Sequence, residues 1–99
     1  MAKQRVVITN QSFRDAGGLE TFPDLEIQDM IVCKAIGEEH GGRISAISAG
    51  IAQLRSTALE QGCSHVFKVE YETIPNPNYH HSYHIFDCEI KGTPYKPKQ

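Results

Sequence analysis

Apolar residues recur at the spacing of an amphipathic helix once along the chain, between residues 43 and 61. The stripe repeats every three or four positions and consists of Ile44, Ile47, Ile51, Leu54 and Ala58. Gly41 and Gly42 precede the segment, and Gly62 follows it, where a residue with left-handed backbone commonly ends a helix. The pattern predicts one long helix over residues 43–61, with this stripe as its apolar face.

Small residues fill the other faces of the predicted helix: Ser45, Ala46, Ser48, Ala49, Gly50, Ala52 and Ser56. Small side chains permit the close approach of a neighbouring backbone, and Gly50 costs the helix roughly 1 kcal/mol relative to alanine unless something needs the room. We therefore expect this surface to pack against a neighbour. Arg55 lies at the edge of the apolar stripe, and we expect a carboxylate near it.

Four segments have the β-branched content or the alternation of β-strands: 5–10, 28–36, 64–74 and 80–91. The third alternates most clearly, with one face assigned to Phe67, Val69 and Tyr71 and the other to Lys68, Glu70 and Glu72. The turn Pro75-Asn76-Pro77-Asn78 joins it to the fourth segment as a hairpin, which Gly92 and Pro94 are expected to end.

The segment 28–36 is mostly apolar on both faces. One face carries Ile31, Cys33 and Ala35, and the other carries Met30, Val32 and Ile36. Such a composition is typical of a central strand, or of a strand whose outer face meets another subunit.

Together these elements predict an α+β fold in which one long helix packs on a small antiparallel sheet, in the order ββαββ. The chain has 99 residues, 39% of them hydrophobic, which is the length of a single domain. We expect residues 1–99 to form that domain. A flexible loop is expected near 11–27, where turn residues and acids gather, and a loose tail near 93–99.

The charge balance and the apolar runs argue against several classes of partner. Ten lysines and arginines stand against twelve aspartates and glutamates and are scattered, which argues against nucleic acid. No apolar run approaches the roughly 20 residues of a membrane-spanning helix, and the first residues lack the apolar centre of a signal peptide. Cys33, Cys63 and Cys88 have neither metal-site spacing nor the density of a disulfide scaffold. We expect a cytoplasmic protein with reduced thiols and no membrane partner.

One cluster has metal-binding chemistry, because imidazole is a common ligand of transition-metal ions. The candidate ligands are His80, His81 and His84, within Tyr79-His80-His81-Ser82-Tyr83-His84. In a straight strand His80 and His84 would lie about 13 Å apart, too far for one ion. A site therefore needs a curled loop, ligands from neighbouring subunits, or help from His65. This geometry favours the other interpretation, a set of exposed rings at a hairpin end or a subunit contact.

No catalytic group is predicted. The cysteines lack a neighbouring base, and alternation assigns Cys88 to a buried face. A carboxylate-rich patch on the hairpin offers acid and base groups: Glu70, Glu72, Asp87 and Glu89. Their positions on the polar face favour exposure, or pairing with Lys68, Lys91 and Arg55, over catalysis.

Four stretches carry a family resemblance: Ile36-Gly37-Glu38, Gly62-Cys63-Ser64, Val66 to Thr73, and Ile90-Lys91-Gly92-Thr93. Over roughly residues 25–95 the chain resembles the YbjQ-type family of small bacterial domains, to which heavy-metal binding is attributed and whose fold is shared with the stress lipoprotein RcsF. The resemblance implies one helix on an antiparallel sheet and a ring-like homo-oligomer, a pentamer in that family. The chain departs from the family in its cysteine at position 63, in its longer acidic loop, and in lacking the lipidation signal and cysteine framework of RcsF, so an envelope-sensing role is not implied.

The sequence therefore predicts a small cytoplasmic, non-enzymatic, homo-oligomeric domain that binds a metal ion or another small ligand. The alternative is a protein-protein interaction module that uses an exposed strand edge and the acidic loop, since an unpaired edge is a template for another chain.

Overall fold

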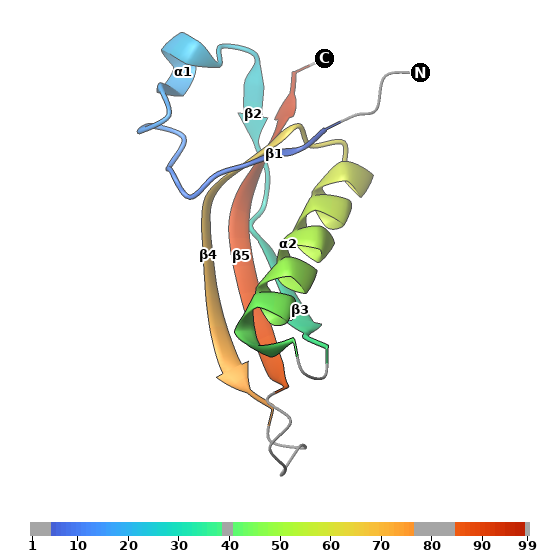
Figure 1. The fold of residues 1–99 in the computed structure, drawn as a ribbon. Helices are drawn as coiled ribbons and strands as arrows, with labels where there is room; N and C mark the ends of the chain where they lie inside the picture. The colour runs from blue at the N-terminus through green and yellow to red at the C-terminus, as the bar shows by residue number, and fades with distance from the viewer. Residues whose placement is uncertain (1–4, 39–40, 77–84, 99) are drawn as a thin grey trace.

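The computed structural model describes residues 5–38, 41–76 and 85–98. In chain order the elements are β1 (Val7–Ile8), α1 (Gly18–Thr21), β2 (Leu25–Ile27), β3 (Ile31–Ile36), α2 (Gly42–Glu60), β4 (His65–Pro75) and β5 (Phe86–Pro97). The fold is α+β, with one long helix lying on a five-stranded sheet (Figure 1). Three strands precede α2, so the predicted order ββαββ is not confirmed.

Strand β5 is the centre of the sheet. It pairs antiparallel with β4 along one side, and along the other side with β3 and then β2. The short β1 adds parallel to the start of β4, so the sheet is mixed rather than wholly antiparallel. Contrary to the prediction from the sequence, β5 does not end at Gly92 and Pro94. It continues to Pro97, because β2 supplies a partner for residues 95–97.

The predicted long helix is confirmed, and the stripe expected to be its apolar face is confirmed in part, because Leu54 and Ala58 are buried and Ile51 packs against the core. The buried residues of α2 are Ala46, Gly50, Leu54 and Ala58, whereas Ile44 is 78% exposed. The helix lies so close to the sheet that a methyl group on Gly50 would stand 2.9 Å from Cys88 Sγ. Of the small residues, Ala46 and Gly50 are buried, and Gly50 accommodates this chain's own β5, whereas Ser48, Ala52 and Ser56 are exposed.

Two further predictions for α2, its end at Gly62 and a carboxylate near Arg55, have different outcomes. Gly62 adopts a positive φ of 76°, and the Cys63 N–H donates to the Ala58 carbonyl at 2.9 Å, which confirms the predicted helix end. The carboxylate expected beside Arg55 is not found, since Lys91–Glu70 is the single ion pair recorded within the described residues.

A β-bulge at Lys68 and Val69 breaks the alternation predicted for β4. Phe67 stands opposite Thr93 and Glu70 opposite Lys91, so two residues face Gly92 alone. Lys68 takes a φ of 54°, a conformation that costs a non-glycine residue about 1–3 kcal/mol. The bulge reverses the faces, and Phe67 therefore lies on the face opposite Val69, not beside it as predicted. Gly92 provides the space that the bulge needs, because a methyl group at this position would clash with Val66 Cγ1.

The strand predicted over residues 28–36 begins at Ile31 and is an edge strand within this chain. Within the described residues it pairs with β5 alone, so a central position is excluded. Its residues alternate between buried positions beneath α2 and exposed positions on the opposite face. Val32 and Ile36 on the exposed face are 59% and 60% accessible. No described element therefore covers its apolar outer face.

The segment expected to be a loop near 11–27 contains α1 and β2 and packs on the sheet face opposite α2. Phe13 stacks on Tyr95 with ring centroids 4.4 Å apart, and Phe22 lies 5.5 Å from Phe67. The Lys98 N–H donates to the Asp24 carbonyl, which holds the end of β5 against this segment. The flexibility predicted for this segment and the single-domain organisation stay predictions. Within the described residues, no helix is long and apolar enough to cross a membrane.

Candidate functional site

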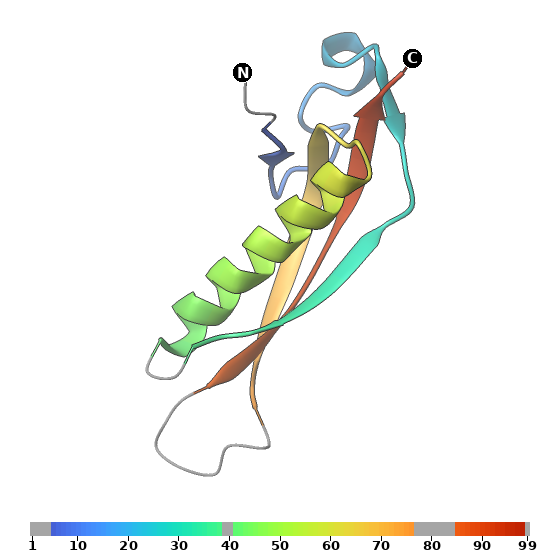
Figure 2. The same ribbon diagram turned by 90° about the vertical axis from the view of Figure 1, so that its right-hand side faces the viewer.

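The lower half of the sheet has one covered face and one bare face. Helix α2 lies across β3 and β5 on one side, while no described element covers the other side below the segment that carries α1 (Figure 2). Strand register orders the bare face into three rows that run from β3 through β5 to β4: Val32–Lys91–Glu70, Lys34–Glu89–Glu72 and Ile36–Asp87–Ile74. Charged residues thus occupy the middle row and the middle strand of this face, and aliphatic residues occupy three of its four corners, the fourth being Glu70.

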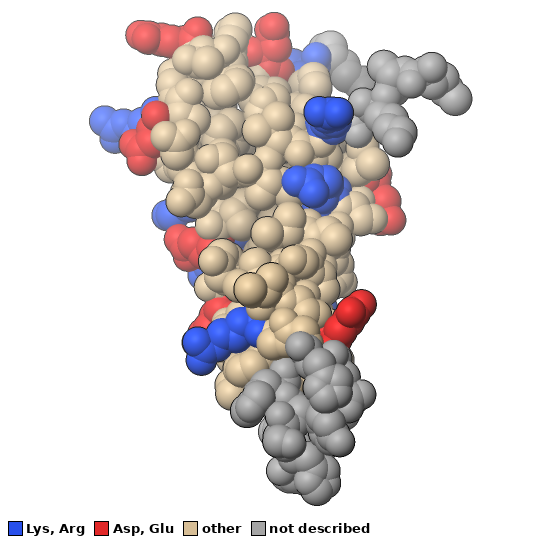
Figure 3. Space-filling model, in the orientation of Figure 1, with Lys and Arg blue, Asp and Glu red and all other residues tan. Residues whose placement is uncertain are grey.

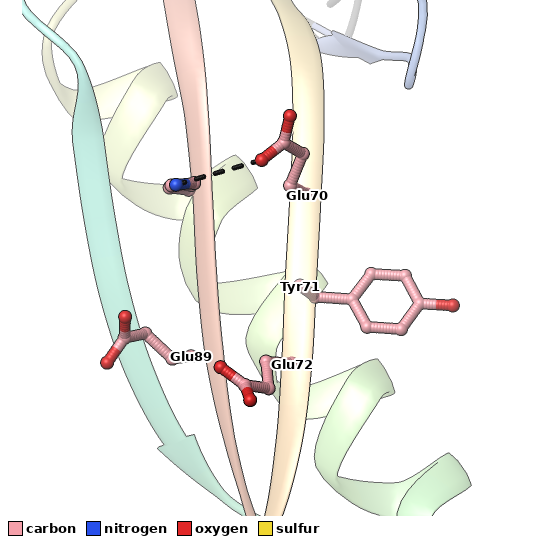
Figure 4. A pocket seen from close by; sticks show the side chains of 5 residues that line it. Glu70, Tyr71, Glu72 and Glu89 are labelled. Carbon is pink, nitrogen blue, oxygen red and sulfur yellow. Dashed lines mark ion pairs between the residues drawn. The ribbon is translucent and has the colours of Figure 1, made fainter.

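The predicted carboxylate patch belongs to this bare face. Glu70 and Glu72 extend from β4 toward β5, Glu89 extends from β5 toward β3, and Tyr71 points away from them (Figure 4). Lys91 Nζ lies 3.7 Å from Glu70 Oε2, with both side chains about half exposed, which confirms the pairing expected with Lys91. Asp87 accepts a hydrogen bond from Asn76 Nδ2 at 2.7 Å. Glu70, Glu72 and Glu89 are exposed and Asp87 is half-buried, so three of the four carboxylates have the environment of a solvated surface.

The middle row has an unbalanced charge at one end. Glu89 lies between Lys34 on β3 and Glu72 on β4, so it has a cation on one side and a like charge on the other. Like charges directly opposite one another destabilise a strand pair. Beyond Glu72 no described strand follows, so this carboxylate lacks the cation that would complete the alternation.

In the described part of the chain, β3 and the lower part of β4, which flank β5, have open edges. The outer side of β3 has no partner strand in the described residues, and β1 and the segment after it reach along β4 only as far as Val69. Apolar side chains accompany these edges, and their exposed fractions run from 44% to 60%: Met30, Val32, Ile36, Tyr71 and Ile74. Open edges beside exposed apolar residues are the usual template for pairing with another strand.

A second feature, which sequence reasoning missed, is an aromatic cluster on the face opposite α2. It comprises Phe13, Phe22, His65, Phe67 and Tyr95. The His65 ring stacks on Phe67 at 5.6 Å, and its Nδ1 shares a hydrogen bond of 2.8 Å with Ser64 Oγ. The sequence signal for this cluster was the presence of two phenylalanines in a segment otherwise full of turn residues and acids. Aromatic rings are usually buried, so these two residues indicated that the segment packs against the sheet.

Burial in this cluster lowers the pKa of the His65 imidazole from its ordinary value. The folded state therefore favours the neutral ring, and the stability that follows is complete above about pH 6.5, the pKa in an unfolded chain. That stability is lost as the pH falls from there through the lower pKa of the folded state. We expect urea titrations between about pH 8 and pH 5 to show this loss, and a His65→Phe variant to lose less stability over the same range. Equal losses in both proteins would contradict the assignment.

The three cysteines are buried free thiols. Burial raises the pKa of the Cys88 thiol, and it raises the pKa of Cys63 despite the opposing charge of Lys96. Both thiols are therefore protonated near neutral pH, whereas a thiol nucleophile reacts as the thiolate.

The predicted metal ligands His80, His81 and His84 lie outside the described residues. In the part of the chain that the structure describes, no three His, Cys, Asp or Glu side chains are grouped as metal ligands would be. The histidine cluster stays a prediction.

Comparison with known proteins adds no relative. No protein-family model, no curated protein and no solved structure matches the chain significantly. The resemblance to the YbjQ-type family therefore stays a prediction.

Lysines, arginines and acids are scattered over the face shown in Figure 3, around a broad uncharged area. This distribution suits a protein contact better than a phosphate backbone, which needs clustered cations.

Proposed function

We propose that the chain is a subunit of a homo-oligomer in which β3 of one copy pairs with β4 of the next, and that this assembly, not catalysis, is its role. The observation that carries the proposal is the unbalanced row Lys34–Glu89–Glu72, whose two ends lie at the two open edges. A second copy would bring a lysine to the glutamate that lacks one.

The strand directions support this pairing. Strands β3 and β4 are each antiparallel to β5, so they run parallel to one another. If β3 of a second copy continues the sheet beside β4 at the same level, its Lys34 comes beside Glu72 and its Ile36 beside Ile74. An opposite-charge pair and an aliphatic pair on one face each stabilise adjacent strands.

The symmetric alternatives are less favourable. An antiparallel β3–β3 pair centred on Lys34 places two lysines together, and a β4–β4 pair centred on Glu72 places two glutamates together. The pairing of unlike edges is heterologous, so the assembly closes as a ring or grows as a fibre. A ring is what the family resemblance implies, and we extend the proposal to a ring of five copies.

Charge exchange across the interface tests the proposal. We expect the wild type to sediment as an oligomer, and Lys34→Glu or Glu72→Lys to weaken each interface roughly 5- to 30-fold, equivalent to about 1–2 kcal/mol. The double variant Lys34→Glu/Glu72→Lys restores the opposite-charge pair and should recover the oligomer. Lys98→Glu, the same charge change at the exposed end of the chain, is the control.

Sedimentation velocity or native mass spectrometry measures the outcome. A wild type that stays at 11.1 kDa at tens of micromolar would overturn the proposal. An oligomer that Lys34→Glu and Glu72→Lys leave intact would overturn the assigned edges.

The second candidate is an interaction module that accepts a strand of another protein at the same edges, with the exposed acids of residues 15–24 as a further contact. It is favoured by the same open edges, and it predicts a monomer that binds an extended peptide of alternating lysine and isoleucine along β4. We place either function in the cytoplasm, because three buried free thiols suit a reducing compartment.

A further inference from the structure

A groove of about 290 Å³ lies at the upper end of the sheet, on the face opposite α2. Phe13, Phe67, Tyr95 and Ile27 form its apolar part, and Arg14 and Lys68 supply two cations. No acidic residue lines it. The groove is bounded by β2, β4, β5 and the segment before α1, away from the free edge of β3 and from the part of β4 proposed to pair with another copy.

Lys68 has a backbone conformation that favours glycine or asparagine. Within the described residues it is the one non-glycine residue with a positive φ. Its N–H donates to the Gln11 carbonyl at 2.7 Å, and the Val69 N–H donates to the Thr9 carbonyl at 3.1 Å, so neighbouring backbone holds the bulge in place. A strained residue that tertiary contacts maintain is a pointer to function, because a glycine would form the same bulge at lower cost.

Neither cation of the groove has an acidic partner among the described residues. In the described part of the chain, no carboxylate lies within ion-pair distance of Arg14 or Lys68, and both residues are exposed. Beside them, Ile27 leaves 60% of its surface uncovered. The groove therefore combines two unpaired positive charges with an apolar surface.

From this combination we propose that the groove binds a small organic anion with a flat apolar body, of the aromatic carboxylate class. The rings of Phe13 and Tyr95 would contact the body, and Arg14 and Lys68 would bind the carboxylate through charge-assisted hydrogen bonds. The volume suits a body of one or two rings, because pockets for larger ligands usually exceed about 300 Å³. This inference is independent of the proposed assembly.

The probe is 1-naphthoate, with the neutral 1-naphthamide as its matched control. Titration followed by NMR should give saturable binding of naphthoate with a dissociation constant below roughly 1 mM, with shifts of the Phe13 and Tyr95 ring protons, and at least tenfold weaker binding of the amide.

Two variants separate binding from folding. Lys68→Gly removes a cation and relieves the backbone strain, so its thermal midpoint should equal or exceed that of the wild type while naphthoate binding weakens at least fivefold. Arg14→Gln should weaken binding by a similar factor, and Lys68→Arg should retain it. No saturation up to about 10 mM naphthoate, equal binding of the amide, or unchanged binding in both Lys68→Gly and Arg14→Gln would overturn the proposal.

Discussion

Leu54→Ala is expected to lower the free energy of unfolding by about 3–5 kcal/mol. The Leu54 side chain is 0% exposed, at the middle of the contact between α2 and the sheet. The helix backbone is already close to β5 at Gly50, so α2 cannot move inward to fill the space that the leucine leaves. The cavity therefore adds its own cost to the lost transfer of apolar surface from water. Urea denaturation at one fixed protein concentration measures the effect, because assembly makes apparent stability depend on concentration.

Ile44→Ala is the matched control on the same helix. Ile44 belongs to the apolar stripe read from the sequence but is 78% exposed, so its truncation should change the free energy of unfolding by no more than about 0.5 kcal/mol. If Ile44→Ala were as destabilising as Leu54→Ala, the orientation of α2 described above would be wrong.

Phe67→Ala is expected to have a comparable effect, about 3–5 kcal/mol, on the opposite face of the sheet. Phe67 is 2% exposed and contacts the rings of four residues, Phe13, Phe22, His65 and Tyr95. Its loss removes the surface on which the segment before β2 packs. Hydrogen exchange should therefore accelerate at the amides that connect this segment to β4, including the Lys68 N–H bonded to Gln11.

Tyr71→Ala provides the comparison for that experiment, because Tyr71 is an aromatic residue of the same strand that is 55% exposed. We expect this variant to lose less than about 1 kcal/mol and to leave exchange in residues 11–24 unchanged. Similar losses from the two truncations would mean that the aromatic cluster is not a second core.

The candidate site was only partly predictable. Exposure of Glu70 and Glu72 and the pairing with Lys91 followed from alternation along β4, which holds on the lower side of the bulge. The unbalanced row Lys34–Glu89–Glu72 could not be predicted from the sequence, because it depends on which strands flank β5. The cationic groove depends on residues from three separate segments, Arg14, Lys68 and Tyr95, and no local pattern relates them.

The sequence by itself determined the long helix, its glycine end at Gly62 and the two paired strands after it, because each depends on periodicity and on local backbone chemistry. It did not determine the whole buried stripe of α2, because Leu54 and Ala58 are buried as predicted but Ala46 and Gly50 are buried with them and Ile44 is not. Helix-sheet distance decides that, and the close approach at Gly50 places small residues inside and Ile44 outside. Tertiary structure likewise decided the reversal of faces at Lys68. Gly92 on the neighbouring strand makes room for the bulge, and the backbone of the segment after β1 holds it in place.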